Sequence, residues 1–113
     1  MNIIVTSNSK RPQLLQQTLE SLDENSTLEH TITLVLDKHF GLVLPIYSVV
    51  ATITLHNSVG ASACRNVGAS SIPKYSRSEY VLFSDDDCFY TAGWDHKLVN
   101  VLKANGEIGR AHV

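Results

Sequence analysis

Residues 80–88 read YVLFSDDDC, an apolar run that ends in three consecutive acidic residues. The first four side chains are typical of a buried β-strand. Three carboxylates this close repel one another, and an apolar strand beside them offers little solvation, so a divalent cation or a hydrogen-bonding ligand would offset the cost. We therefore predict that the functional site lies at Asp85, Asp86 and Asp87.

Outward from this stretch, apolar runs alternate with helical patterns along the whole chain. Strands are predicted over residues 3–6, 31–36, part of 46–55 and 78–83, and helices over 12–22, 61–71 and from Trp94 to the Asn105-Gly106 stop. Residues 38–45 read as a loop, with a short helix at 42–44 as the alternative. This alternation predicts an α/β fold, with an open, mostly parallel sheet, right-handed crossovers and flanking helices.

The last predicted helix carries an apolar stripe at helical spacing. Trp94, Leu98, Val101 and Leu102 form it, and we expect them to face the core.

In an open parallel sheet, ligands bind beyond the carboxyl ends of the strands. The residues expected there are polar and lie far apart in the sequence. They are Thr6-Ser7, Asp37, His56-Asn57 and Asp85 to Asp87. One crevice is therefore expected to collect them.

Composition excludes several classes of function. The chain has 113 residues, 43% of them hydrophobic, and a net charge of -2, which suits one globular domain over residues 1–113 and gives no basic surface for nucleic acid. We expect no transmembrane segment, because no apolar stretch reaches about 18 residues. The start of the chain lacks a signal-peptide pattern, so a cytoplasmic protein is predicted. Cys64 and Cys88 lack the spacing of a zinc site or a disulfide framework.

Side-chain alternation on extended backbone would turn Asp85 and Asp87 to one side and Asp86 to the other. Mg²⁺ or Mn²⁺ binds one or two carboxylates and completes its coordination with waters and phosphate oxygens. Asp85 and Asp87 are therefore predicted metal ligands. The alternative is a solvated acidic turn at the start of the next helix.

Four landmarks in order resemble a known family. The first is IIVT at residues 3–6, followed by RPQLL at 11–15 and TLESL at 18–22; then come Asp37 at a strand end, GASACRNVG at 60–68, and FSDDD at 83–87 with Gly93-Trp94. Together they resemble the donor-binding part of family-2 glycosyltransferases of the GT-A fold, a Rossmann-like nucleotide-diphospho-sugar-binding half.

The resemblance implies a role for each matched residue. Thr6 and Ser7 would lie near the base and ribose, Asp37 would accept a base N–H, Arg65 would bind the diphosphate, and Asp85 and Asp86 would complete the nucleotide-sugar site, with Asp85 and Asp87 at the metal. Each has a simpler alternative. Asp37 is also typical of a turn, and Arg65 of a surface ion pair.

The implied reaction is transfer of a sugar from a nucleotide-diphosphate donor, with a UDP-sugar favoured, to an acceptor hydroxyl. The chain differs from the family pattern after Asp37, where residues 38–41 read KHFG, so base and sugar specificity are left open. The family's acceptor half and catalytic carboxylate would follow residue 113. No catalytic base is predicted in these residues, and self-association into a homo-oligomer is left open.

The sequence leaves two alternative functions open. A non-catalytic or partner-dependent module would bind a nucleotide and a metal without turnover. A haloacid-dehalogenase-like phosphatase would use the first Asp of a D-x-D motif as a nucleophile, but that signature places Thr or Val where this chain has Phe89.

Overall fold

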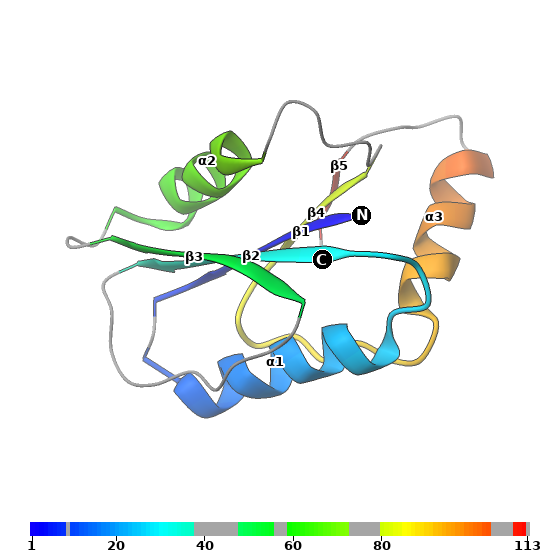
Figure 1. Ribbon diagram of the computed structural model, residues 1–113, viewed down its shortest axis with the longest axis horizontal. Helices are drawn as coiled ribbons and strands as arrows, with labels where there is room; N and C mark the ends of the chain where they lie inside the picture. The colour runs from blue at the N-terminus through cyan, green and yellow to red at the C-terminus, as the bar shows by residue number, and fades with distance from the viewer. Residues whose placement is uncertain (9, 38–47, 56–58, 73–79, 105–109, 113) are drawn as a thin grey trace.

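The computed structural model describes residues 1–8, 10–37, 48–55, 59–72, 80–104 and 110–112. They form a sheet with helices on both faces (Figure 1). The expected loop at 38–45 and the strand-end pair His56-Asn57 lie outside these residues.

Within the described residues every strand pair of the sheet is parallel, in agreement with the predicted mostly parallel sheet. The strands lie in the order β3-β2-β1-β4-β5. Their bounds are Asn2–Ser7 (β1), Thr31–Asp37 (β2), Val49–Leu55 (β3), Val81–Ser84 (β4) and Arg110–His112 (β5). Four of them were predicted from apolar runs. The fifth was missed, because its three residues carry no such run.

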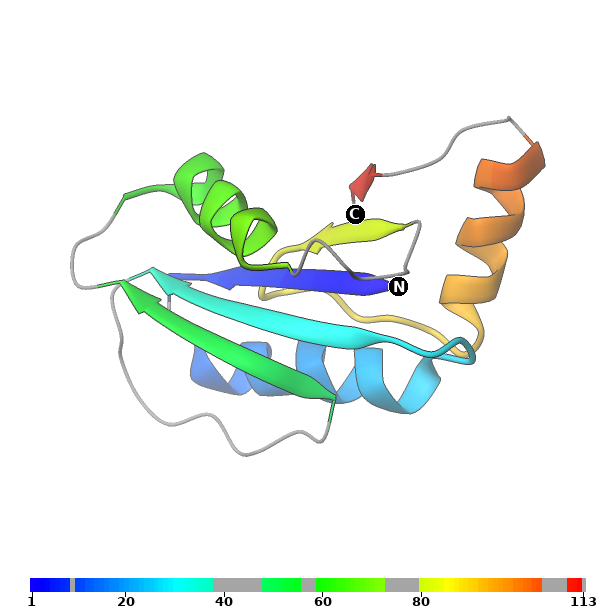
Figure 2. The ribbon, with the colours of Figure 1, turned by 45° about the horizontal axis from the view of Figure 1, so that its top comes forward.

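The helices are α1 (Pro12–Asn25), α2 (Ala61–Ser71) and α3 (Trp94–Ala104). In two views, α1 lies below the sheet and α2 above it (Figures 1 and 2). Pro12 begins α1 because its fixed φ suits a first helical position, where no backbone N–H is needed. The helix runs three residues past the predicted end at Leu22.

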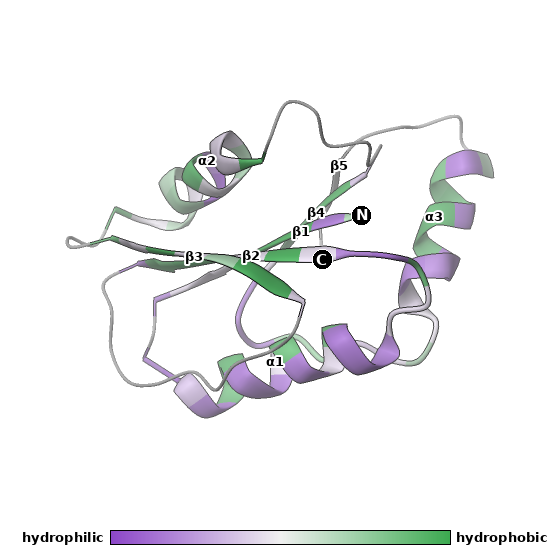
Figure 3. Cartoon of the chain, in the orientation of Figure 1, coloured by the Kyte–Doolittle hydropathy of each residue, from purple (hydrophilic) through white to green (hydrophobic). Residues whose placement is uncertain are grey.

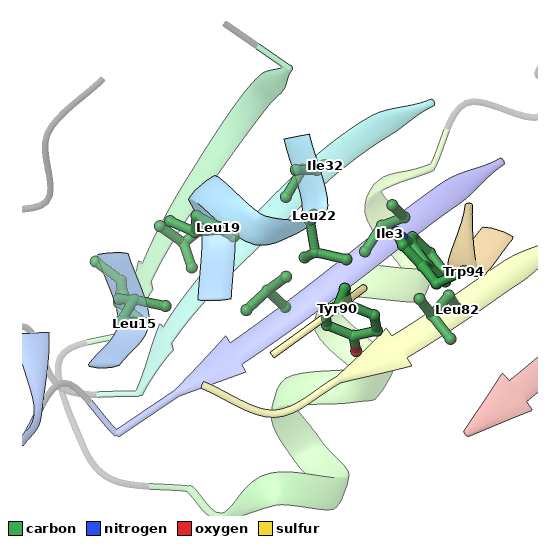
Figure 4. Close-up of a cluster of buried hydrophobic side chains, with 11 residues drawn as sticks. Ile3, Leu15, Leu19, Leu22, Ile32, Leu82, Tyr90 and Trp94 are labelled. Atoms are coloured by element: carbon green, nitrogen blue, oxygen red, sulfur yellow. The ribbon is translucent and has the colours of Figure 1, made fainter. Parts of the chain in front are cut away.

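The larger core cluster lies on the α1 face of the sheet (Figure 4). Ile3 and Val5 of β1 face Leu15, Leu19 and Leu22 of α1, because alternate residues of a strand point to one face. Tyr90 and Trp94 extend this cluster, with ring centroids 4.7 Å apart and planes at 53°. Trp94 is therefore a core residue.

A smaller cluster lies on the α2 face. It contains Ile4, Val35, Cys64 and Phe83. Gly68 brings α2 very close to the sheet, because a Cβ built there would lie 2.5 Å from Ile4 Cγ2. Both faces of the central strands are thus buried, as their continuous apolar sequences predicted.

The hydropathy of α1 and α3 alternates around each helix (Figure 3). In α3 the predicted stripe was wrong at one position, since Val101 is 55% exposed and Val99 is buried in its place. Trp94, Val99 and Leu102 face inward at spacings of five and three residues, and Leu98 is partly buried. None of the helices within the described residues is both long and apolar enough to cross a bilayer.

The strand order changes direction at β1. The chain passes from β1 to β2 and β3 on one side, and then returns to β4 on the other side of β1. Such a switch point leaves a crevice at the carboxyl ends of the two strands on either side of it. This feature of the topology positions the site.

Candidate functional site

A pocket of about 370 Å³ lies at the carboxyl ends of β1, β2 and β4, a size within the usual range for small-molecule sites. Residues from all three strand ends and from the starts of α1 and α2 line it. They are Thr6, Ser7, Asn8, Arg11, Asp37, Gly60, Ala61, Cys64 and Asp85 to Asp87. The pocket therefore lies where the strand order changes direction.

Asp86 is the fixed member of the acidic triplet. It is buried, and its Oδ2 accepts a 2.7 Å hydrogen bond from the Ser7 hydroxyl at the end of β1. Its backbone carbonyl accepts a 2.8 Å hydrogen bond from the Thr18 hydroxyl of α1. Arg11 Nη2 lies 3.5 Å from Asp86 Oδ1. These contacts join β1, α1 and the segment after β4 at one carboxylate.

Asp85 and Asp87 are about half exposed, and each lies beside an arginine. Arg65 Nη2 of α2 is 3.6 Å from Asp85 Oδ1, and Arg11 Nη2 is 3.5 Å from Asp87 Oδ2. Strand alternation, which we expected to separate Asp86 from Asp87, ends at Ser84, and residues 86–87 lie in a turn. That turn lets one guanidinium contact both carboxylates.

Asp37 closes the opposite wall of the pocket. Its Oδ1 accepts the Val59 N–H at 2.8 Å, and its Oδ2 accepts the Gly60 N–H at 3.0 Å. Gly60 has φ +89, a conformation that favours glycine, and precedes the first residue of α2. Asp37 therefore braces the turn into α2.

Thr6, Ser7 and Cys64 form the buried floor of the pocket. Burial raises the pKa of the Cys64 thiol, and the nearby Asp37 carboxylate raises it further. Cys64 is thus a neutral packing residue, in keeping with the reduced thiol predicted from the sequence.

Tyr90 supports the acidic triplet from the core. Its hydroxyl donates a 2.6 Å hydrogen bond to Ser84 Oγ, and Ser84 Oγ donates to the Asp85 carbonyl at 3.0 Å. Burial raises the pKa of Tyr90 well above its ordinary value, so the phenol remains protonated and can keep donating.

The pocket carries a strongly negative formal charge. Among the residues that the structure describes, four carboxylates and one guanidinium line it, which gives a formal charge of -3. An anionic diphosphate would be repelled by this wall unless a cation accompanied it.

The residues present match a magnesium-type ion in ligand chemistry. Within the part of the chain that the structure describes, no group of three or more His, Cys, Asp or Glu side chains is placed to hold a metal ion. Mg²⁺, however, ordinarily binds through one or two carboxylates together with waters and substrate phosphates. Asp85 and Asp87, half exposed and in the pocket wall, provide oxygen ligands of that kind.

Of the predicted site residues, Thr6, Ser7, Asp37 and the three aspartates line one pocket. Arg65 reaches the same site through its ion pair with Asp85. Sequence reasoning missed Arg11 as a site residue, although the Arg11-Pro12 pair at a helix start was visible. Four other lining residues were not predicted, because the course of the backbone brings them to the pocket. They are Asn8, Gly60, Ala61 and Cys64.

Comparison with known proteins identifies the family. The family model described as glycosyl transferase family 2 matches residues 2–110, nearly the whole chain. Neither a search of curated proteins nor a search of solved structures found a significant match. The family match confirms the resemblance drawn from the sequence motifs, and the parallel sheet is consistent with the GT-A fold. The chain belongs to glycosyl transferase family 2.

Proposed function

We propose that residues 1–113 form a donor-binding domain that holds a nucleotide-diphosphate sugar together with Mg²⁺ or Mn²⁺ for transfer to an acceptor hydroxyl. One observation carries the proposal: Ser7, Asp37 and the acidic triplet, which come from three strand ends, converge on one pocket at the switch point of the sheet. Membership of glycosyl transferase family 2 supports it and does not favour the phosphatase alternative.

Each part of the donor has a complementary part of the pocket. Thr6, Ser7 and Asp37 would receive the base and ribose, and a UDP-sugar is the donor we favour because a carboxylate accepts the ring N–H of uracil well. Asp85 and Asp87 would hold the metal. A metal ion bound there would neutralise the diphosphate and stabilise the negative charge that develops on the diphosphate as the sugar is transferred.

Arg65 is placed to add a second positive charge near the diphosphate. It lies 3.6 Å from Asp85, and its side chain is 35% exposed, so it can exchange that carboxylate for a phosphate oxygen. A guanidinium forms paired hydrogen bonds with phosphates.

Two assays on the same protein test the proposal. Calorimetry would measure binding of UDP, GDP and dTDP with and without Mn²⁺, and a release assay would follow hydrolysis of the matching sugar donors. We expect metal-dependent binding of one nucleotide diphosphate. Binding without hydrolysis or transfer would support the alternative of a non-catalytic module, and no binding of any nucleotide would overturn the proposal.

A further inference from the structure

Arg11 contacts two members of the acidic triplet, Asp86 and Asp87, whereas Arg65 contacts Asp85. Arg11 is the residue before Pro12, at the N-cap of α1, and this places its side chain at the pocket wall. One nitrogen, Nη2, lies 3.5 Å from Asp86 Oδ1 and 3.5 Å from Asp87 Oδ2. A guanidinium has five N–H donors, so these contacts leave others available.

The two carboxylates beside Arg11 differ in how firmly they are held. Asp86 is buried and bonded to Ser7, so it remains in place whether or not a ligand is bound. The Asp87 side chain is 47% exposed and faces the pocket. A cation that bound Asp87 would compete with Arg11 for the same oxygens. Asp86 would keep Arg11 at the site after that competition.

The Arg11 side chain is itself 52% exposed, so the core does not enclose it. At such exposure the ion pair with Asp87 contributes little to stability. The charge on Arg11 matters more to an anionic ligand, because among the described lining residues Arg11 is the cation beside four carboxylates.

We propose that Arg11 is a donor-binding residue that exchanges partners: it pairs with Asp87 in the free protein and turns to the donor's diphosphate when a metal ion takes Asp87. Asp86 keeps Arg11 at the site during this exchange. The inference rests on the proposed function, since it requires a metal and a diphosphate in this pocket.

The exchange predicts effects of opposite sign on two ligands. Removing the charge in Arg11→Gln frees Asp87, so Mn²⁺ alone should bind about threefold more tightly. The same variant lacks a charge-assisted bond to phosphate, so UDP at saturating Mn²⁺ should bind about tenfold more weakly. Arg11→Lys keeps the charge but lacks the paired N–H donors of a guanidinium. Its UDP affinity should therefore fall between those of the wild type and Arg11→Gln.

The test is calorimetry on the whole chain, first with MnCl₂ alone and then with UDP at saturating Mn²⁺. Lys103→Gln is the control, because Lys103 is exposed near the end of α3 and its loss changes the net charge equally. Its two affinities should stay within about twofold of wild type, since screening weakens distant charges. Circular dichroism would confirm that each variant is folded.

Opposite shifts in Arg11→Gln, with the Lys103 control unchanged, support the exchange. If wild type binds UDP and Arg11→Gln matches it for both ligands, or binds both more weakly, the exchange is overturned and the proposed function stands. If Arg11→Gln does not fold, Arg11→Lys decides: wild-type UDP affinity in that variant overturns the exchange. If wild type binds no UDP, GDP or dTDP with Mn²⁺, the proposed function fails and the exchange fails with it.

Discussion

The Ser7 hydroxyl donates a 2.7 Å hydrogen bond to Asp86 Oδ2, and both residues are buried. This bond joins the end of β1 to the acidic triplet, 79 residues later in the chain. It fixes the middle carboxylate, so that Asp85 and Asp87 remain as the exposed pair. The acidic triplet therefore divides into one structural and two accessible aspartates.

Ser7→Ala should lower the free energy of unfolding by about 1–2 kcal/mol, because a buried charged acceptor loses a donor. Urea denaturation would measure the change. Ser62→Ala, at an exposed position of α2, is the matched control and should change stability by less than about 0.5 kcal/mol. Equal effects of the two substitutions would contradict the anchoring role of Ser7.

Asp95 fixes the start of α3. It is 1% exposed, and its carboxylate accepts the backbone N–H groups of Thr27, Leu28 and His96. Burial alone would raise the pKa of Asp95, but the N–H donors of Leu28, Thr27 and His96 outweigh it and hold the pKa below its ordinary value. The charged form is therefore the one that the fold stabilises.

Asp95→Asn should lower the free energy of unfolding by about 2–3 kcal/mol at pH 7. A depressed folded-state pKa gives stability that is full above the unfolded value of about 3.9 and is lost as pH falls through the folded value. The difference between wild type and variant should therefore stay constant from about pH 7 to 5 and shrink below about pH 4.

Thermal and urea unfolding across this pH range would test the Asp95 prediction. Glu24→Gln, an exposed carboxylate-to-amide change in α1, is the control and should show no such pH-dependent gap. If the difference in the free energy of unfolding between wild type and Asp95→Asn grew on acidification, the fold would not be stabilised by the charged form of Asp95.

The fold was largely predictable because it depends on local patterns. β2 is apolar on both faces, which predicts burial in a parallel sheet, and Pro12 and Pro73 mark a helix start and stop that appear in the sequence itself. Val101 was misplaced because the apolar residues of α3 fit two adjacent faces of the helix, and the spacing in the sequence does not show which face is buried.

The candidate site was predictable in its members but less so in its contacts. Strand ends are visible in a sequence, and the topology rule brings Ser7, Asp37 and Asp85 together. The pairing of Arg11 with Asp86 and Asp87 follows from the turn after Ser84, and alternation along an extended strand could not predict that turn.

Gly68→Ala should lower the free energy of unfolding by about 1–3 kcal/mol. The new methyl would lie 2.5 Å from Ile4 Cγ2 and 3.2 Å from Val35 Cγ2, so α2 must move away from the sheet. Ser70→Ala, at an exposed position of the same helix, should be neutral or slightly stabilising, since Ala favours helices. Denaturant titration of both variants tests this. A stabilised Gly68→Ala would show that the packing of α2 on the sheet does not require glycine at this position.

Asp87→Asn should weaken binding of UDP with Mn²⁺ by about tenfold or more, because the proposed metal ligand loses its charge. Stability should change by less than about 1 kcal/mol, since the residue is half exposed and its ion pair contributes little. Calorimetry gives the affinity and urea unfolding the stability. An affinity within about twofold of wild type, or roughly 0.4 kcal/mol, would remove Asp87 from the metal site.

We propose that the pocket at the ends of β1, β2 and β4 binds a metal and a nucleotide diphosphate. Paramagnetic broadening of backbone amide resonances by substoichiometric Mn²⁺, with and without UDP, locates the ion directly. We expect broadening centred on Asp85 to Asp87 that strengthens when UDP is added, with shifts at Ser7 and Gly60 when Mg²⁺ replaces Mn²⁺. Broadening centred on other carboxylates, such as Glu20 and Glu24 of α1, with no effect of UDP, would contradict this proposal.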